Sequence, residues 1–180
     1  MRSYRKQLSC LSLFLFLVLV FSTACSNSDG DVPSGMQKIV SEAEDYNLYV
    51  PKNWVVDTIQ GMTSAAVGDA AKSSVSVSAV AMSSVEQDAA ENYWSSLREQ
   101  YEATFVNWTL EEEGTETTLG DVKAYKYRFT GEVSGITYQW MQVIGIRSGT
   151  YYTFTYTSTK DAYEDNIEDV ISILEYFEFN

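Results

Sequence analysis

The spacing of apolar and polar residues along residues 36–180 alternates between the two-residue period of strands and the longer period of helices. Residues 73–82, SSVSVSAVAM, alternate small polar with apolar side chains, which is typical of a strand with one covered face. Residues 46–59, YNLYVPKNWVVDTI, indicate a strand, a turn and a second strand, because Pro51 pre-sets the turn and cannot lie inside a ladder. Both segments therefore predict β-structure.

A first helical segment begins near residue 83. Ser83 with Glu86, or Ser84 with Gln87, has the spacing of a capping box. An apolar stripe at helical spacing follows, with charged side chains on the other side, so we predict a surface helix packed on a core. The stripe consists of Ala89, Ala90, Tyr93, Trp94, Leu97, Tyr101 and Phe105.

A second helical segment lies near the end of the chain, in residues 160–179, KDAYEDNIEDVISILEYFEF. The apolar residues recur at helical spacing, and a short strand is expected over residues 175–179. The predicted inward-facing residues are Tyr163, Ile167, Val170, Ile171 and Leu174.

Strand-like segments separated by short turns fill the region between the two helices. Turns are expected near residues 119–121, 131–135 and 147–149. Short separations imply hairpins, and consecutive hairpins form an antiparallel meander. Strands, a helix, a meander and a helix in this order predict an α+β domain: an antiparallel sheet flanked by helices in an α/β/α sandwich.

Several of these segments resemble the PsbP-like and DcrB-like domains. The stretch YNLYVPKNW is similar to the family's opening, with Tyr46, Leu48, Pro51 and Trp54 at the aromatic, apolar, proline and tryptophan positions. DVKAYKYRFTG, SGTYYTFTYTST and the closing segment YEDNIEDVISILEYFEF resemble later family segments in the same order. The resemblance implies an antiparallel sheet between helices and a role as an accessory or docking protein. The matched motifs are packing motifs, so they transfer no functional residue.

The N-terminus has the pattern of a secretory signal. Basic residues precede an apolar stretch over residues 8–21, which is shorter than a membrane-spanning helix requires. Ser22-Thr23-Ala24-Cys25 then resembles the lipobox of bacterial lipoproteins, with Ser22 where an aliphatic residue is usual. The resemblance implies cleavage after residue 24 and acylation of Cys25, with palmitate-type chains anchoring the protein in the membrane.

The polar stretch after Cys25 divides the rest of the chain into a flexible tether over residues 25–35 and one domain over residues 36–180. Residues 1–24 hold three of the 12 basic residues and no acidic residue. Residues 25–180 therefore carry nine basic against 25 acidic side chains, a formal charge of −16. Such a charge repels phosphate backbones and excludes nucleic acid as a partner.

The chain contains no histidine. This excludes Ser–His–Asp and Cys–His nucleophile systems and histidine-based metal sites, and the familiar phosphate-binding loops are absent as well. We therefore predict no cofactor, no metal site and no enzymatic activity. Carboxylates remain in two runs, which we interpret as a solvated surface; paired carboxylates of a glycan hydrolase are the alternative. The runs are Glu111, Glu112, Glu113 and Glu116, and Asp161, Glu164, Asp165, Glu168 and Asp169.

Aromatic residues on the predicted strands offer a possible binding surface, with Tyr138, Trp140 and Tyr152 the first to test. Packing between strands is the alternative interpretation for them. The sequence thus predicts a lipid-anchored, non-catalytic protein on the extracytoplasmic face of a bacterial cell membrane that binds another envelope protein or a ligand. A carboxylate-based glycan hydrolase and a small-solute-binding lipoprotein are the alternatives.

Overall fold

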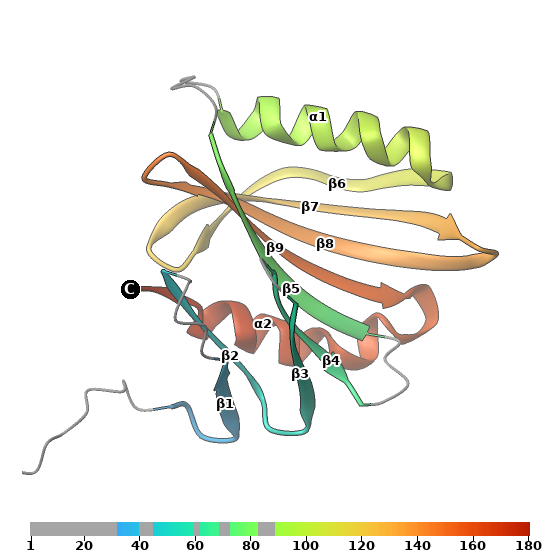
Figure 1. Ribbon diagram of the computed structural model, residues 1–180. Coiled ribbons are helices and arrows are strands. Elements are labelled where there is room, and N and C mark those ends of the chain that lie inside the picture. The colour runs from blue at the N-terminus through green and yellow to red at the C-terminus, as the bar shows by residue number, and fades with distance from the viewer. Residues whose placement is uncertain (1–31, 40–44, 60–61, 69–72, 83–88) are drawn as a thin grey trace, which may run out of the picture. The chain divides into compact units, whose positions relative to one another are not determined.

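The computed structural model describes residues 32–39, 45–59, 62–68, 73–82 and 89–180 (Figure 1). The predicted signal and most of the predicted tether lie outside these residues, as does the predicted capping box. Among the described residues, no helix has the length and hydrophobicity needed to cross a bilayer. The elements are β1 (Met36–Ile39), β2 (Tyr46–Pro51), β3 (Trp54–Ile59), β4 (Met62–Val67), β5 (Ser73–Ala81), α1 (Ala89–Thr104), β6 (Val106–Leu119), β7 (Val122–Val133), β8 (Ile136–Arg147), β9 (Thr150–Thr159), the 3-10 turns η1 (Lys160–Ala162) and η2 (Glu164–Asn166), α2 (Ile167–Tyr176) and β10 (Glu178–Phe179).

Seven of the described strands form one antiparallel sheet in the order β3-β4-β5-β9-β8-β7-β6. Strands β6 to β9 form the predicted meander, because tight turns connect each strand to the next. Strand β9 also pairs with β5 along its whole length, which joins the two halves of the sheet. The α+β prediction is confirmed: Figure 1 shows α1 along one face of the sheet and α2 against the other.

A second, smaller sheet has the order β1-β2-β10. The sequence predicts the strand, turn and strand over residues 46–59 correctly, but the two strands belong to different sheets. Pro51 ends β2, and the chain then enters β3 of the large sheet. The short strands β1 and β4 were not predicted from the sequence.

Helix α1 covers an aromatic cluster on its face of the sheet. The two-residue period of β7 and β8 brings Tyr127, Phe129 and Trp140 to this face. Trp94 of α1 stacks on Tyr127 with ring centroids 3.9 Å apart, and Phe105 stacks on Trp140 at 4.6 Å. Stacked pairs stabilise by about 0.5–1.5 kcal/mol beyond the burial of their area.

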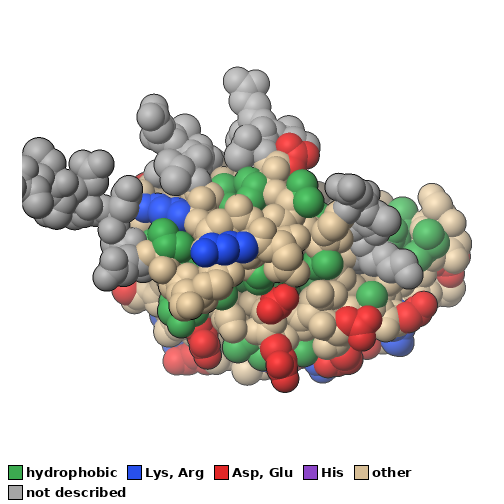
Figure 2. All heavy atoms as spheres, turned by 90° about the horizontal axis from the view of Figure 1, so that it is seen from below, with side chains coloured by type: hydrophobic (Ala, Val, Ile, Leu, Met, Phe, Trp, Pro, Cys, Tyr) green, Lys and Arg blue, Asp and Glu red, His purple; other side chains and the backbone are tan. Residues whose placement is uncertain are grey.

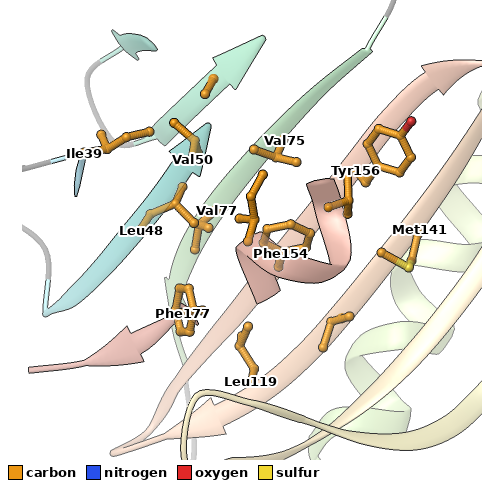
Figure 3. Packing of buried hydrophobic residues seen from close by; sticks show 14 of the residues in the cluster. Ile39, Leu48, Val50, Val75, Val77, Leu119, Met141, Phe154, Tyr156 and Phe177 are labelled. Atoms are coloured by element: carbon orange, nitrogen blue, oxygen red, sulfur yellow. The ribbon is translucent and has the colours of Figure 1, made fainter. Parts of the chain in front are cut away.

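The other face carries the larger hydrophobic core, which α2 and the small sheet close (Figure 3). Val75 and Val77 of β5 lie against Phe154 and Tyr156 of β9, and all four are almost fully buried. Burying a side chain of this size contributes about 1.5–3 kcal/mol to the free energy of unfolding.

The inward stripe of the last helix differs from the prediction at two residues, because Ile171 was expected to be buried and Ile173 was not. Val170 and Ile173 are fully buried, whereas Ile171 is 48% exposed. All three residues lie within α2, where residues three positions apart share a face and adjacent residues are about 100° apart around the axis. Ile171 therefore lies beside the core-facing stripe.

Candidate functional site: a groove beside helix α2

A groove of about 370 Å³ lies between α2 and the strands β6, β7 and β8. Its strand side carries charged and polar residues, and its helix side is mainly apolar. We call it the α2 groove; it is lined by Glu112, Thr117, Thr118, Lys126, Arg128, Met141, Val143, Tyr163, Glu164, Ile167, Ile171, Leu174 and Glu175.

Two cations of β7 lie on the strand side, because residues two apart on a strand point to the same face. Lys126 Nζ lies 3.2 Å from Glu112 Oε1, and Arg128 Nε lies 3.3 Å from Glu111 Oε2. Burial alone would raise the pKa of Glu112, but hydrogen bonds with Thr115 and Lys126 outweigh it and hold that pKa below its ordinary value. Glu112 is therefore a fixed anion in the groove.

The apolar wall comes from α2 and β8. Ile167, Ile171 and Leu174 follow each other at spacings of four and three, so they form one stripe along the helix. Met141 and Val143 of β8 meet this stripe from the sheet. Ile171 is nearly half exposed although it belongs to this wall. The wall thus offers accessible apolar surface to a ligand.

Tyr163 adds a neutral polar group to the groove. Burial raises its pKa well above the ordinary value for tyrosine, so the phenol keeps its proton at physiological pH. Glu164 and Glu175 lie at the exposed rim. Figure 2 views the molecule from below Figure 1 and shows acidic side chains gathered along one margin, with fewer basic ones.

Glu112 is not suited to act as the general acid of a glycan hydrolase. A general acid for glycan hydrolysis needs a raised pKa, and Glu112 has a lowered one. In the described part of the chain, no cluster of three or more His, Cys, Asp or Glu side chains is arranged to hold a metal ion.

The structure separates the three aromatic residues that the sequence singled out. Tyr138 and Trp140 are neighbours on the α1 face, with ring centroids 5.8 Å apart. Tyr152 belongs to the core on the opposite face, where its hydroxyl donates to Asp45. Trp140 and Tyr152 are both buried, so the three residues do not form one surface. Cys25 lies outside the described residues.

Sequence reasoning missed the groove residues Lys126, Arg128 and Ile171. The alternation of basic with aromatic residues over residues 125–129 is a signal that Lys126 and Arg128 lie opposite the aromatic cluster. No sequence signal distinguishes Ile171 from the buried apolar residues of α2.

Together, these features define a small α+β domain with helices on both faces of an antiparallel sheet and an amphipathic groove under one of them. No protein-family model matches the sequence, and no curated protein matches it. Solved structures do match it, and they show that the chain has a PsbP-like fold.

Three of these structures illustrate the likeness. CyanoP, the PsbP of Synechocystis sp. PCC 6803, has a TM-score of 0.60 at 11% identity, with 81% of this chain and 93% of CyanoP covered. The Saccharomyces cerevisiae Ran-binding protein Mog1p has a TM-score of 0.55 at 7% identity, with 80% and 95% covered. LpqN, involved in cell envelope biogenesis of Mycobacterium tuberculosis, has a TM-score of 0.53 at 12% identity, with 81% and 91% covered. At these identities the likeness establishes the fold alone.

Proposed function

We propose that this protein is a lipid-anchored, non-catalytic binding protein on the extracytoplasmic face of a bacterial membrane. Acyl chains on Cys25 hold it there, and residues 25–35 act as the tether. The protein docks a segment of another envelope protein in the α2 groove. Two proteins of the same fold support this class of function, since Mog1p is Ran-binding and LpqN is involved in cell envelope biogenesis.

The observation that carries the proposal is the exposure of Ile171 in the wall of the α2 groove. It is 48% exposed, between the exposed carboxylates Glu164 and Glu175. Exposed apolar surface rimmed by polar residues is typical of interaction sites. The acidic rim and the formal charge of −16 on residues 25–180 favour a basic, amphipathic segment as the occupant.

Site-specific photocrosslinking in living cells tests the docking proposal. A photoreactive amino acid replaces Ile171 in one variant and Val55 in the control. Val55 is exposed to the same extent, 48%, but lies on the edge strand β3. We expect one discrete adduct from position 171 and none from position 55. The position-171 adduct should disappear when Glu164→Lys and Glu175→Lys are added. The same adducts from both positions, or none from position 171, would contradict the proposal.

Cell fractionation tests the anchor separately. Cys25→Ala should leave the protein unprocessed or release it from the membrane, because the acylated sulfur is lost. Cys10→Ala lies inside the predicted signal and should leave processing and membrane association unchanged. A processed Cys25→Ala protein that still sediments with membranes would contradict the anchor.

A further inference from the structure

A second pocket, of about 360 Å³, is formed by α1, β6 and β7 on the face of the sheet opposite the α2 groove. Its volume is at the small end of the range for ligand sites in proteins. We call it the aromatic pocket; it is lined by Trp94, Ser95, Glu113, Gly114, Tyr125 and Tyr127.

An irregularity in β6 shapes this pocket. The register between β6 and β7 shifts between Glu112 and Thr115, so Glu113 and Gly114 lie in a bulge. Gly114 has a φ of +65°, which glycine adopts without strain. Arg98 of α1 holds Glu113, with Nη1 3.0 Å from Oε1. Bulges of this kind re-aim side chains, and this one presents a carboxylate beside aromatic rings.

The pocket is lined by aromatic rings, and one of them, Trp94, carries a buried unsatisfied donor. Trp94 stacks on Tyr127, and Tyr125 is partly exposed next to them. The indole Nε1 of Trp94 is buried and has no hydrogen-bond partner among the described residues. A buried donor without an acceptor costs about 1–3 kcal/mol, so an acceptor supplied by a ligand would recover part of this cost.

The charges around the pocket select against charged ligands. Lys123 Nζ lies 5.3 Å from the centroid of the Tyr125 ring and 2.8 Å from Glu116 Oε2. Arg98 pairs with both Glu102 and Glu113. These charges already have partners of opposite sign, so neither a cation nor an anion would find an unpaired counter-charge among them. A neutral ligand with an apolar face and several hydroxyl groups remains.

We infer that the aromatic pocket binds a neutral pyranose ring of a glycan. The apolar C–H face of the sugar packs on Tyr125, and one hydroxyl donates a hydrogen bond to Glu113. Another hydroxyl oxygen accepts a hydrogen bond from Trp94 Nε1 after a small rotation of the indole. This site is independent of the α2 groove, so it goes beyond the proposed docking function.

Saturation-transfer NMR on the full chain, purified in a detergent without a sugar headgroup, tests this inference. The probes are the methyl glycosides of glucose, galactose, mannose and N-acetylglucosamine, with choline and acetate as charged probes. We expect saturation transfer to the ring protons of at least one glycoside and none to choline or acetate. No transfer to any glycoside, or a preference for a charged probe, would overturn the inference.

Variants then locate the binding site for the best glycoside. Tyr125→Ala should weaken binding about tenfold, because it removes the stacking face. Trp94→Phe keeps the stack but removes the donor, and should weaken binding about fivefold. Glu113→Gln keeps the side-chain shape but removes the charge, and it should also weaken binding. This second variant still tests the site if Tyr125→Ala does not fold.

Trp108→Phe is the matched control. Trp108 Nε1 is also buried without a partner among the described residues, but Trp108 does not line the pocket. Its replacement should leave the affinity unchanged. Equal affinities for Tyr125→Ala, Glu113→Gln and the unaltered protein would place the sugar elsewhere and overturn the inference.

Discussion

Trp54 Nε1 of β3 donates a hydrogen bond to Asp169 Oδ2 of α2 over 3.3 Å. The indole is buried, and the bond joins residues 115 positions apart in the chain. The sequence placed Asp169 on a solvated acidic surface, but the structure gives it a partner from the large sheet. This contact fixes the helix that forms the apolar wall of the α2 groove.

Trp54→Phe should therefore destabilise the fold by about 1.5–3 kcal/mol, the range for a hydrogen bond to a charged group. The free energy of unfolding from guanidinium titration of the full chain measures this effect. Asp169→Asn should cost less, because the amide oxygen still accepts the bond. Asp165→Asn, an exposed neighbour, should stay within about 0.5 kcal/mol. If Trp54→Phe is as stable as Asp165→Asn, the bond does not stabilise the fold.

Gly131 of β7 lies beneath the end of α1, and the space above it is already filled. A Cβ at this position would lie 2.7 Å from Phe105 Cβ, so Gly131→Ala should force the helix end to shift. We expect a loss of about 1–3 kcal/mol, as for other overpacked sites. Gly145→Ala is the comparison, because its closest neighbour is a Val122 methyl at 3.1 Å, which can yield. In unfolding titrations, Gly131→Ala should be clearly less stable than Gly145→Ala. The reverse order would show that a Cβ at position 131 does not collide with Phe105.

Ser73 and Ser158 form a buried polar pair between β5 and β9, with their hydroxyl oxygens 2.8 Å apart. Asn166 Nδ2 donates to Ser73 Oγ, and Ser158 Oγ donates to the carbonyl of Thr159. Each hydroxyl has only one proton, and Ser158 uses its proton in the bond to Thr159. The bond between the two serines must therefore use the proton of Ser73, so Ser73 donates to Ser158. The four groups thus form one directed series of hydrogen bonds.

Each single replacement, Ser73→Ala or Ser158→Ala, should cost about 1–3 kcal/mol because it leaves a buried partner unsatisfied. The double variant should cost less than the sum of the two, because the second replacement removes the group that the first left unpaired. A double-mutant cycle on the free energy of unfolding measures this coupling. Strict additivity would show that the two hydroxyls are independent.

The sequence predicts the large sheet well because polar and apolar residues alternate along most of its strands over many positions. The alternation in 73–82 and in the meander identifies β5 to β9, and the short turns identify the hairpins. The pairing of β5 with β9 joins distant segments, and no local pattern encodes it. Strand β1 has four residues and β4 is built mostly from small residues. Neither strand therefore shows a clear alternation of polar and apolar residues.

The candidate site was harder to predict, because it depends on the phase of one helix and on where sheet faces meet. Val170 and Ile173 face the core, whereas Ile171 faces the groove one position away. Adjacent residues of an α-helix are about 100° apart around its axis, so a shift of one position decides whether a side chain reaches the core or the groove. Tyr138 and Tyr152 look equivalent in the sequence, but they lie on neighbouring strands and point to opposite faces.

Tyr152 makes the stability of the fold depend on alkaline pH. Burial, together with the hydrogen bond to Asp45 and its negative charge, raises the pKa of Tyr152 from 10.0 to about 12. Between these values the unfolded chain loses the phenolic proton and the folded chain keeps it. The free energy of unfolding should therefore fall as the pH rises from about 10 to about 12, by about 1 kcal/mol per pH unit from this residue.

Tyr152→Phe removes this proton and should make the alkaline fall in stability shallower. It should not abolish the fall, because Tyr101, Tyr156 and Tyr163 also have raised pKa values. Unfolding titrations between pH 7 and pH 12 measure the slopes. Below about pH 9 the two curves should run parallel, with Tyr152→Phe lower by the lost hydrogen bond. Asp45→Asn, which keeps the phenol and removes the charge, should give an intermediate slope. Identical slopes for Tyr152→Phe and the unaltered protein above pH 10 would show that Tyr152 titrates alike in the folded and unfolded chains.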